Sequence, residues 1–150
     1  MTKLFVEKST EINAPASKVW AILTKPEFTR EWAGMFGATG PIDSDWQLGS
    51  QVLWKNAAGK VYVYGKVVAL EPNKLLQFTV RSVKPELQPI SGSDKDEITQ
   101  TYVLLEQDGN TSLSIEHGDF SMLAHGEKIR PGAMTVWDKV LPKIKELAEK

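Results

Sequence analysis

The last part of the chain predicts one long amphipathic helix, from Gly132 to about Glu149. Apolar residues recur there at three- and four-residue steps and share one broad face, while Asp138 and Lys139 fall on the opposite face. A helix with so wide an apolar face needs a sheet to lie on. If that sheet curves around the helix, a cavity remains between them. The apolar face comprises Ala133, Met134, Trp137, Val140, Leu141, Ile144, Leu147 and Ala148.

The first third of the chain predicts one strand followed by two short helices. The strand is expected at residues 4–12 and the first helix at 16–23. The second helix is expected over residues 26–32, since Pro26 suits a first helical position. Thr24 and Glu27 have the spacing of a capping box, in which each side chain bonds the backbone of the other.

The middle of the chain alternates apolar and polar residues in the manner of antiparallel strands. Asp108-Gly109 is a strong hairpin signal between the last two of these strands. The order of elements predicts an α+β fold with an antiparallel sheet. Loops at 34–40, 82–95 and 122–131 are expected to surround the entrance of any cavity. Strands are predicted around Val52 and Trp54, at 61–70, around Phe78, at 97–106 and at 111–120.

Composition limits the classes of function. A length of 150 residues predicts a single domain over 1–150, and a net charge of −1 gives no electrostatic case for nucleic acid. The absence of cysteine excludes a disulfide, a thiol nucleophile and a cysteine metal site. The chain has neither the apolar run of a signal peptide nor a bilayer-spanning stretch. We therefore expect a cytoplasmic protein without stable membrane insertion.

Four short stretches occur in an order and spacing typical of a known superfamily. They are EINAP at 11–15, EPNKL at 71–75, QDGNT at 107–111 and WDKVLPKIKEL at 137–147. Together they resemble the START-like helix-grip (SRPBCC) superfamily, and most of all its branch of activator of heat-shock-protein ATPase homologue-like proteins. The resemblance implies a curved antiparallel sheet of about six to seven strands around the C-terminal helix, with an apolar cavity. It carries over no catalytic motif, because relatives variously bind lipids or polyketides, catalyse cyclisation or hydrolysis, or dock on chaperones.

His117 and Tyr102 are the candidates for catalysis. His117 continues the inward phase of Leu113 and Ile115, and histidine can exchange a proton near neutral pH. His117, Asp119 and His125 match no standard metal-ligand spacing. We therefore expect neither a metal nor a cofactor.

Aromatic and apolar side chains that face the sheet interior are the candidates for a ligand pocket. In the tyrosine-rich strand, Val61, Val63, Val67 and Ala69 make the better core face, so at least one of Tyr62 and Tyr64 is expected outside it. Arg81 and Arg130 are expected in solvent. The candidates for lining the pocket are Trp20, Trp32, Phe36, Trp54, Phe78, Tyr102, His117, Met134, Trp137 and Leu141.

Three functions remain open. The preferred one is binding of a small hydrophobic or amphipathic molecule, lipid-like or aromatic and polyketide-like, in the cavity. The second is a cyclase- or hydrolase-like enzyme that uses His117 and a tyrosine. The third is an interaction module with a chaperone or homodimer contact, for which the sequence offers no charge block or disordered arm.

Overall fold

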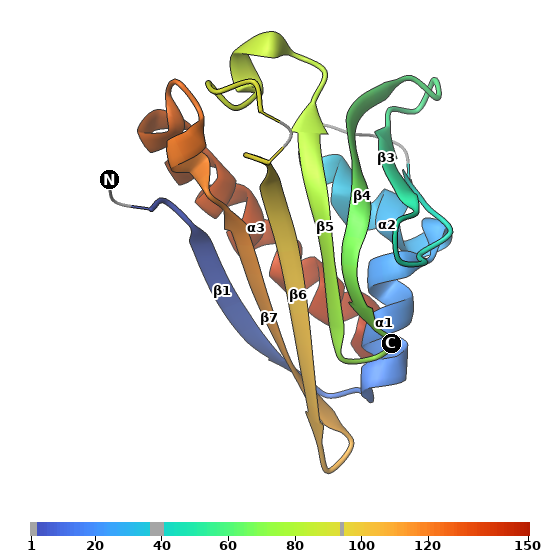
Figure 1. Cartoon of the computed structure of the whole chain (residues 1–150). Coiled ribbons are helices and arrows are strands. Elements are labelled where there is room, and N and C mark those ends of the chain that lie inside the picture. The colour runs from blue at the N-terminus through green and yellow to red at the C-terminus, as the bar shows by residue number, and fades with distance from the viewer. Residues whose placement is uncertain (1–2, 37–40, 94) are drawn as a thin grey trace.

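The computed structural model describes residues 3–36, 41–93 and 95–150. Seven antiparallel strands form one curved sheet in the order β1-β7-β6-β5-β4-β3-β2 (Figure 1). The predicted helix-grip α+β class is confirmed. The strands are β1 (Val6–Ile12), β2 (Ile42–Asp43), β3 (Gln51–Lys55), β4 (Val61–Glu71), β5 (Leu75–Ser82), β6 (Ile98–Gln107) and β7 (Asn110–Gly118).

Three α-helices in the described part of the chain accompany the sheet. α1 (Ala16–Thr24) and α2 (Pro26–Trp32) follow β1, and α3 (Gly126–Glu149) closes the chain. α3 crosses one face of the sheet diagonally behind β7, β6 and β5, and α1 and α2 pack against it (Figure 1). The described residues also form three short 3₁₀ turns: η1 (Ala33–Phe36), η2 (Pro85–Leu87) and η3 (Phe120–Met122).

α3 begins six residues before the predicted start, at Gly126. The sequence suggested a start after Pro131, because proline lacks an N–H group and disfavours a helix interior. Two contacts hold the additional residues in the helix. Gly126 lies so close to η3 that a Cβ atom there would be 1.7 Å from the carbonyl oxygen of Phe120. Arg130, expected in solvent, instead donates from Nε to the carbonyl oxygen of Phe5 at 2.7 Å.

The predicted capping box at the start of α2 is wrong. Thr24 ends α1, and its hydroxyl donates to the carbonyl oxygen of Trp20 at 2.8 Å. The residue that precedes α2 is Lys25, and no side chain caps the helix there. Pro26 at the first helical position already removes one unpaired N–H, which reduces the need for a cap.

The hairpin between β6 and β7 has the predicted turn. Asp108 and Gly109 have φ values of 55° and 82°, and residues 107 and 110 pair across it. Positive φ at both central positions is the geometry for which Asp-Gly is suited. This turn fixes the register that pairs Gln100 with His117 farther along the two strands.

The second half of α3 lies directly on the sheet. Trp137, Val140 and Ile144 have no exposed surface, and Leu141 and Leu147 are buried beside them. Met134 and Ala133, one turn earlier, are only partly buried. The apolar face predicted for this helix therefore forms core at its C-terminal end and leaves its N-terminal half free to border a cavity.

Candidate ligand pocket

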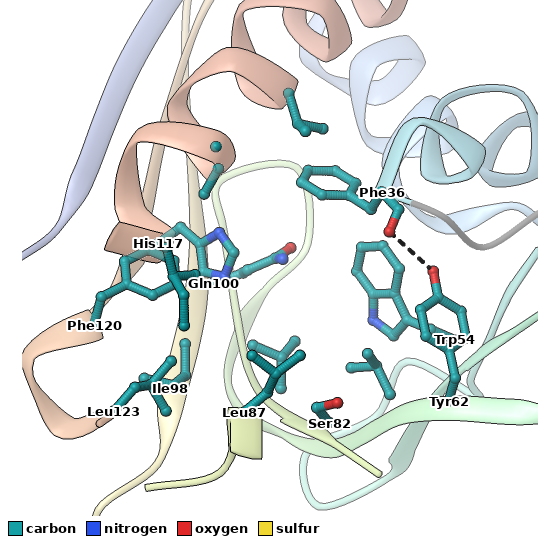
Figure 2. Close-up of a pocket in the computed structure, with 16 residues that line it drawn as sticks. Phe36, Trp54, Tyr62, Ser82, Leu87, Ile98, Gln100, His117, Phe120 and Leu123 are labelled. Carbon is teal, nitrogen blue, oxygen red and sulfur yellow. Dashed lines mark hydrogen bonds between the residues drawn. The ribbon is translucent and has the colours of Figure 1, made fainter. Parts of the chain in front are cut away.

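A pocket of about 460 Å³ lies between the first half of α3 and the sheet (Figure 2). Ile129, Ala133 and Val136 of α3 form one wall. Pockets of a few hundred cubic ångströms with mostly apolar walls are typical of small-molecule sites. Apolar side chains from strands and loops face α3 across this space: Val63, Val80, Leu87, Ile98, Phe120 and Leu123.

The pocket and the core are two ends of the same inward-facing rows. Along β6, Ile98 and Gln100 line the pocket, whereas Tyr102 is 1% exposed in the core. Along β5, Phe78 belongs to the core and Val80 lines the pocket. Because alternate residues of a strand share one face, β5 and β6 each supply residues to the pocket and to the core.

An irregularity in β4 brings a tyrosine to the pocket. Trp54 of β3 pairs with Val63, but the next residue, Lys55, pairs with Val61, so Tyr62 is an extra residue in β4. As a result Tyr62 and Val63 both line the pocket, while Tyr64 is exposed as expected for at least one of the two tyrosines. A bulge of this kind redirects a side chain without ending the strand.

Two polar side chains lie side by side in the pocket wall. Gln100 of β6 and His117 of β7 are directly paired across the strands, and they are 3% and 9% exposed. The Tyr102 hydroxyl donates to Oε1 of Gln100 at 2.6 Å. The indole N–H of Trp137 donates to Nδ1 of His117 at 3.1 Å. Gln100 and His117 are therefore each held in place by a hydrogen bond from an aromatic residue of the core.

Burial controls the charge of these groups. It lowers the pKa of His117 from 6.5 to about 4, so the imidazole is neutral at pH 7. It raises the pKa of Tyr62 to about 12 and that of Tyr102 still further. The phenols are therefore neutral as well, and the polar groups of the pocket are dipoles without charge.

The depressed pKa of His117 predicts a pH-dependent stability. Between pH 6.5 and about 4 the unfolded chain binds a proton that the folded protein excludes, so stability falls as the pH falls through this window. The full effect is roughly 3 kcal/mol, and it is absent above the window. His117→Asn should remove this component. Urea unfolding of both proteins from pH 8 to 4 measures it, and parallel pH profiles of the two proteins would contradict the assignment.

The possible metal-ligand triad does not assemble. Asp119 Oδ1 accepts the backbone N–H groups of Leu4 and Ser121 at 2.8 and 2.9 Å. Burial favours a raised pKa for Asp119, but these hydrogen bonds outweigh it and hold the pKa below its ordinary value. His125 is exposed just before α3. Across residues 3–36, 41–93 and 95–150, no three His, Cys, Asp or Glu side chains are grouped as metal ligands.

The structure separates the predicted pocket residues into three sets. Phe36, Trp54 and His117 line the pocket. Trp20 and Met134 are partly buried at the margin of the core and do not line it. The others pack in the core and also do not line it: Trp32, Phe78, Tyr102, Trp137 and Leu141.

The pocket candidates that the sequence indicates do not include Gln100 or the two adjacent residues at the β4 bulge, Tyr62 and Val63, which line the pocket. Gln100 lies between Ile98 and Tyr102 at a spacing of two, a signal that would have placed it on the inner face. No sequence signal marks the bulge that turns Tyr62 inward. Arg81, expected in solvent, is only partly exposed.

Each of the three expected rims contributes at least one described residue to the pocket. Residues 82–95 supply Ser82 and Leu87, and residues 122–131 supply Leu123 and Ile129. Of the third rim, 34–40, positions 37–40 lie outside the described residues, and Phe36 lines the pocket.

One buried polar atom beside the pocket has no partner. The indole Nε1 of Trp54 is buried and makes no hydrogen bond within the described part of the chain. Its ring instead packs edge-on against Phe36 and Trp32, with ring centroids 5.6 and 6.2 Å away.

No helix in the described ranges is long and apolar enough to cross a membrane.

Solved structures share this fold at low sequence identity. Protein MLL2253 from Mesorhizobium loti has a TM-score of 0.75 at 23% identity, with 95% of this chain and 95% of that chain covered. The Aha1 dimer from Colwellia psychrerythraea has a TM-score of 0.73 at 19% identity, with 99% and 97% covered. CalU16 from Micromonospora echinospora has a TM-score of 0.68 at 15% identity, with 96% and 75% covered. No curated protein matches the chain.

A family comparison identifies the branch. Residues 13–149 match the family described as Activator of Hsp90 ATPase homolog 1-like protein. The match covers both short helices, every strand of the sheet except β1, and α3. It agrees with the motifs at 71–75, 107–111 and 137–147. The chain therefore belongs to the Activator of Hsp90 ATPase homolog 1-like family.

Proposed function

We propose that the protein binds a small apolar or amphipathic molecule in the pocket beneath α3. The observation that carries this proposal is the pocket itself, with about 460 Å³ of space and predominantly apolar walls. Among its lining residues in the described part of the chain, none is Asp, Glu, Lys or Arg. Such a site favours a ligand whose affinity comes from burial of apolar surface.

The polar groups support binding more than acid–base catalysis. A general base needs a free lone pair within reach of the substrate. Nδ1 of His117 accepts a hydrogen bond from Trp137, which leaves the proton of the neutral ring on Nε2. Tyr102 lies in the core and donates to Gln100. The two residues expected for a cyclase- or hydrolase-like mechanism thus have structural partners.

Chaperone docking is the second candidate, favoured by the description of the matched family. An Hsp90-type chaperone should then hydrolyse ATP faster in the presence of this protein. An ATPase rate that stays constant up to a large excess of the protein would contradict this function.

A blocking variant tests ligand binding. Ala133 lines the pocket from α3, so Ala133→Phe places a ring inside it. We expect the neutral fluorophore N-phenyl-1-naphthylamine to bind the parent protein saturably with 1:1 stoichiometry. The blocked variant should bind it about tenfold or more weakly, a loss of about 1.4 kcal/mol. Fluorescence titration measures both.

Thr135→Phe is the matched control, because Thr135 is exposed on the same helix and the same ring is introduced. The control should bind the fluorophore like the parent protein. Non-saturable binding by the parent, or equal loss in both variants, would contradict the proposed function.

A further inference from the structure

We propose that Gln100 and His117 form a paired hydrogen-bond donor site for a carbonyl oxygen on a neutral, ring-containing ligand. The inference rests on the proposed function and specifies the chemistry of the ligand. It depends on the direction of two hydrogen bonds that come from the core, on the adjacency of the two side chains, and on the neutral aromatic walls around them.

The orientation of the Gln100 amide follows from Tyr102. The Tyr102 hydroxyl is buried, and its one hydrogen bond in the described part of the chain is to Oε1 of Gln100 at 2.6 Å. If the amide were turned around, Nε2 would face the hydroxyl and the phenolic proton would have no acceptor. A buried donor without a partner is costly, so the observed orientation is favoured. The NH₂ group of Gln100 is then left for the pocket.

The tautomer of His117 follows from Trp137. An indole N–H can only donate, so Nδ1 of His117 must accept and cannot carry a proton. In the neutral ring the proton therefore resides on Nε2. In the described part of the chain the side-chain hydrogen bonds of these two residues are those to Tyr102 and Trp137, which leave Nε2 of His117 and the NH₂ group of Gln100 without a partner. Neither atom is among the fully buried unpaired polar atoms, so both keep some accessible surface.

The two donors are placed to meet a single oxygen. Gln100 and His117 are direct cross-strand partners, a relation that puts Cβ atoms about 4.5–5.5 Å apart. Figure 2 shows both side chains projecting from neighbouring strands into the space lined by the pocket residues. A carbonyl oxygen has two lone pairs and can accept from both donors at once.

The remaining walls select a neutral ring system. No cationic side chain among the described lining residues is available to balance a carboxylate, and burying an unpaired charge is strongly unfavourable. Nδ1 of His117 is fully engaged by Trp137 and one lone pair of Gln100 Oε1 is engaged by Tyr102, so the pair offers a ligand more free N–H donors than acceptors. Phe36, Trp54 and Phe120 supply aromatic surface around the pair. These features together describe an aromatic or polycyclic ketone or quinone.

Three probes that share the fluorene ring system test this chemistry: 9-fluorenone, fluorene and fluorene-9-carboxylate. Competition with N-phenyl-1-naphthylamine gives their affinities for the parent protein. We expect 9-fluorenone to bind about tenfold more tightly than fluorene, and the carboxylate to bind most weakly. Equal affinities for the ketone and the hydrocarbon would overturn the inference while leaving the proposed function intact. A protein that does not bind the fluorophore would overturn the proposed function.

His117→Asn separates the two hydrogen bonds of the histidine. Oδ1 of asparagine can take the place of Nδ1 and accept from Trp137, while the donor at Nε2 is lost. The variant should bind 9-fluorenone several-fold more weakly and fluorene unchanged. His125→Asn is the matched control, because His125 is exposed and is not among the lining residues. Unchanged ketone affinity in His117→Asn would contradict the role of His117.

Infrared spectroscopy provides a readout that needs no variant. The carbonyl stretch of bound ¹³C-labelled 9-fluorenone should lie at lower frequency than in an alkane solvent, because hydrogen bonds weaken the C=O bond. A bound frequency equal to that in the alkane would show that no donor contacts the oxygen, and would overturn the inference even if the affinities differ.

Discussion

Replacing Trp137 by alanine is expected to lower the free energy of unfolding by about 3–5 kcal/mol. Trp137 has no exposed surface and belongs to the part of α3 that packs on the sheet. Its ring contacts Phe36, Tyr102 and His117, with centroids 4.9, 6.1 and 6.1 Å away. Truncation would leave a cavity among three elements and remove the hydrogen bond to His117.

Urea unfolding followed by circular dichroism measures this loss. Trp137→Phe keeps much of the ring volume but removes the indole donor, so its expected cost is the smaller one of about 1–3 kcal/mol. Lys139→Ala is the control for the helix itself, because Lys139 is exposed on α3. A cost for Trp137→Ala no larger than that of the control would show that this residue does not join α3 to the sheet.

Gly65→Ala should be at least as damaging, with an expected cost above about 4 kcal/mol or loss of soluble protein. A Cβ atom at Gly65 would lie 1.7 Å from the carbonyl oxygen of Thr79. That oxygen belongs to the backbone of β5 and cannot rotate away. The neighbouring backbone is also fixed, because the N–H of Lys66 donates to the Thr79 hydroxyl at 2.9 Å. The methyl group would therefore push β4 and β5 apart.

The same substitution at Gly132 is the matched control. A Cβ atom there has no neighbour within 4 Å, and the position lies inside α3. Alanine at a helix-interior glycine position typically gains about 0.5–1 kcal/mol. Thermal unfolding should thus show a lower midpoint for Gly65→Ala and a slightly higher one for Gly132→Ala. Equal midpoints for parent and Gly65→Ala would refute the close approach of the two strands.

Features with a local cause were predictable from the sequence. The apolar face of α3 follows from the three- and four-residue spacing that contains Val140 and Ile144, and burial of both residues confirms it. The hairpin at Asp108-Gly109 follows from the backbone freedom of these two residues. His117 on the inner face follows from the strand period of two.

Features set by contacts distant in sequence were not predictable. The start of α3 at Gly126 depends on packing against Phe120, which overrides the effect of Pro131. The inward turn of Tyr62 depends on an irregular register with β3. Whether an inward residue lines the pocket depends on how far α3 lies from the sheet at that point. Periodicity therefore placed Trp137 and His117 on the right faces without separating the core residue from the pocket residue.

The most direct test of the pocket is to locate a bound probe by NMR. With N-phenyl-1-naphthylamine bound to methyl-labelled protein, we predict nuclear Overhauser effects from its rings to Val63, Ile98, Leu123 and Val136. These residues come from four different segments and meet only around the pocket. Leu105, exposed on β6, is the control and should show none. Effects confined to exposed methyls such as Leu105, or none to the four pocket residues, would contradict a ligand site beneath α3.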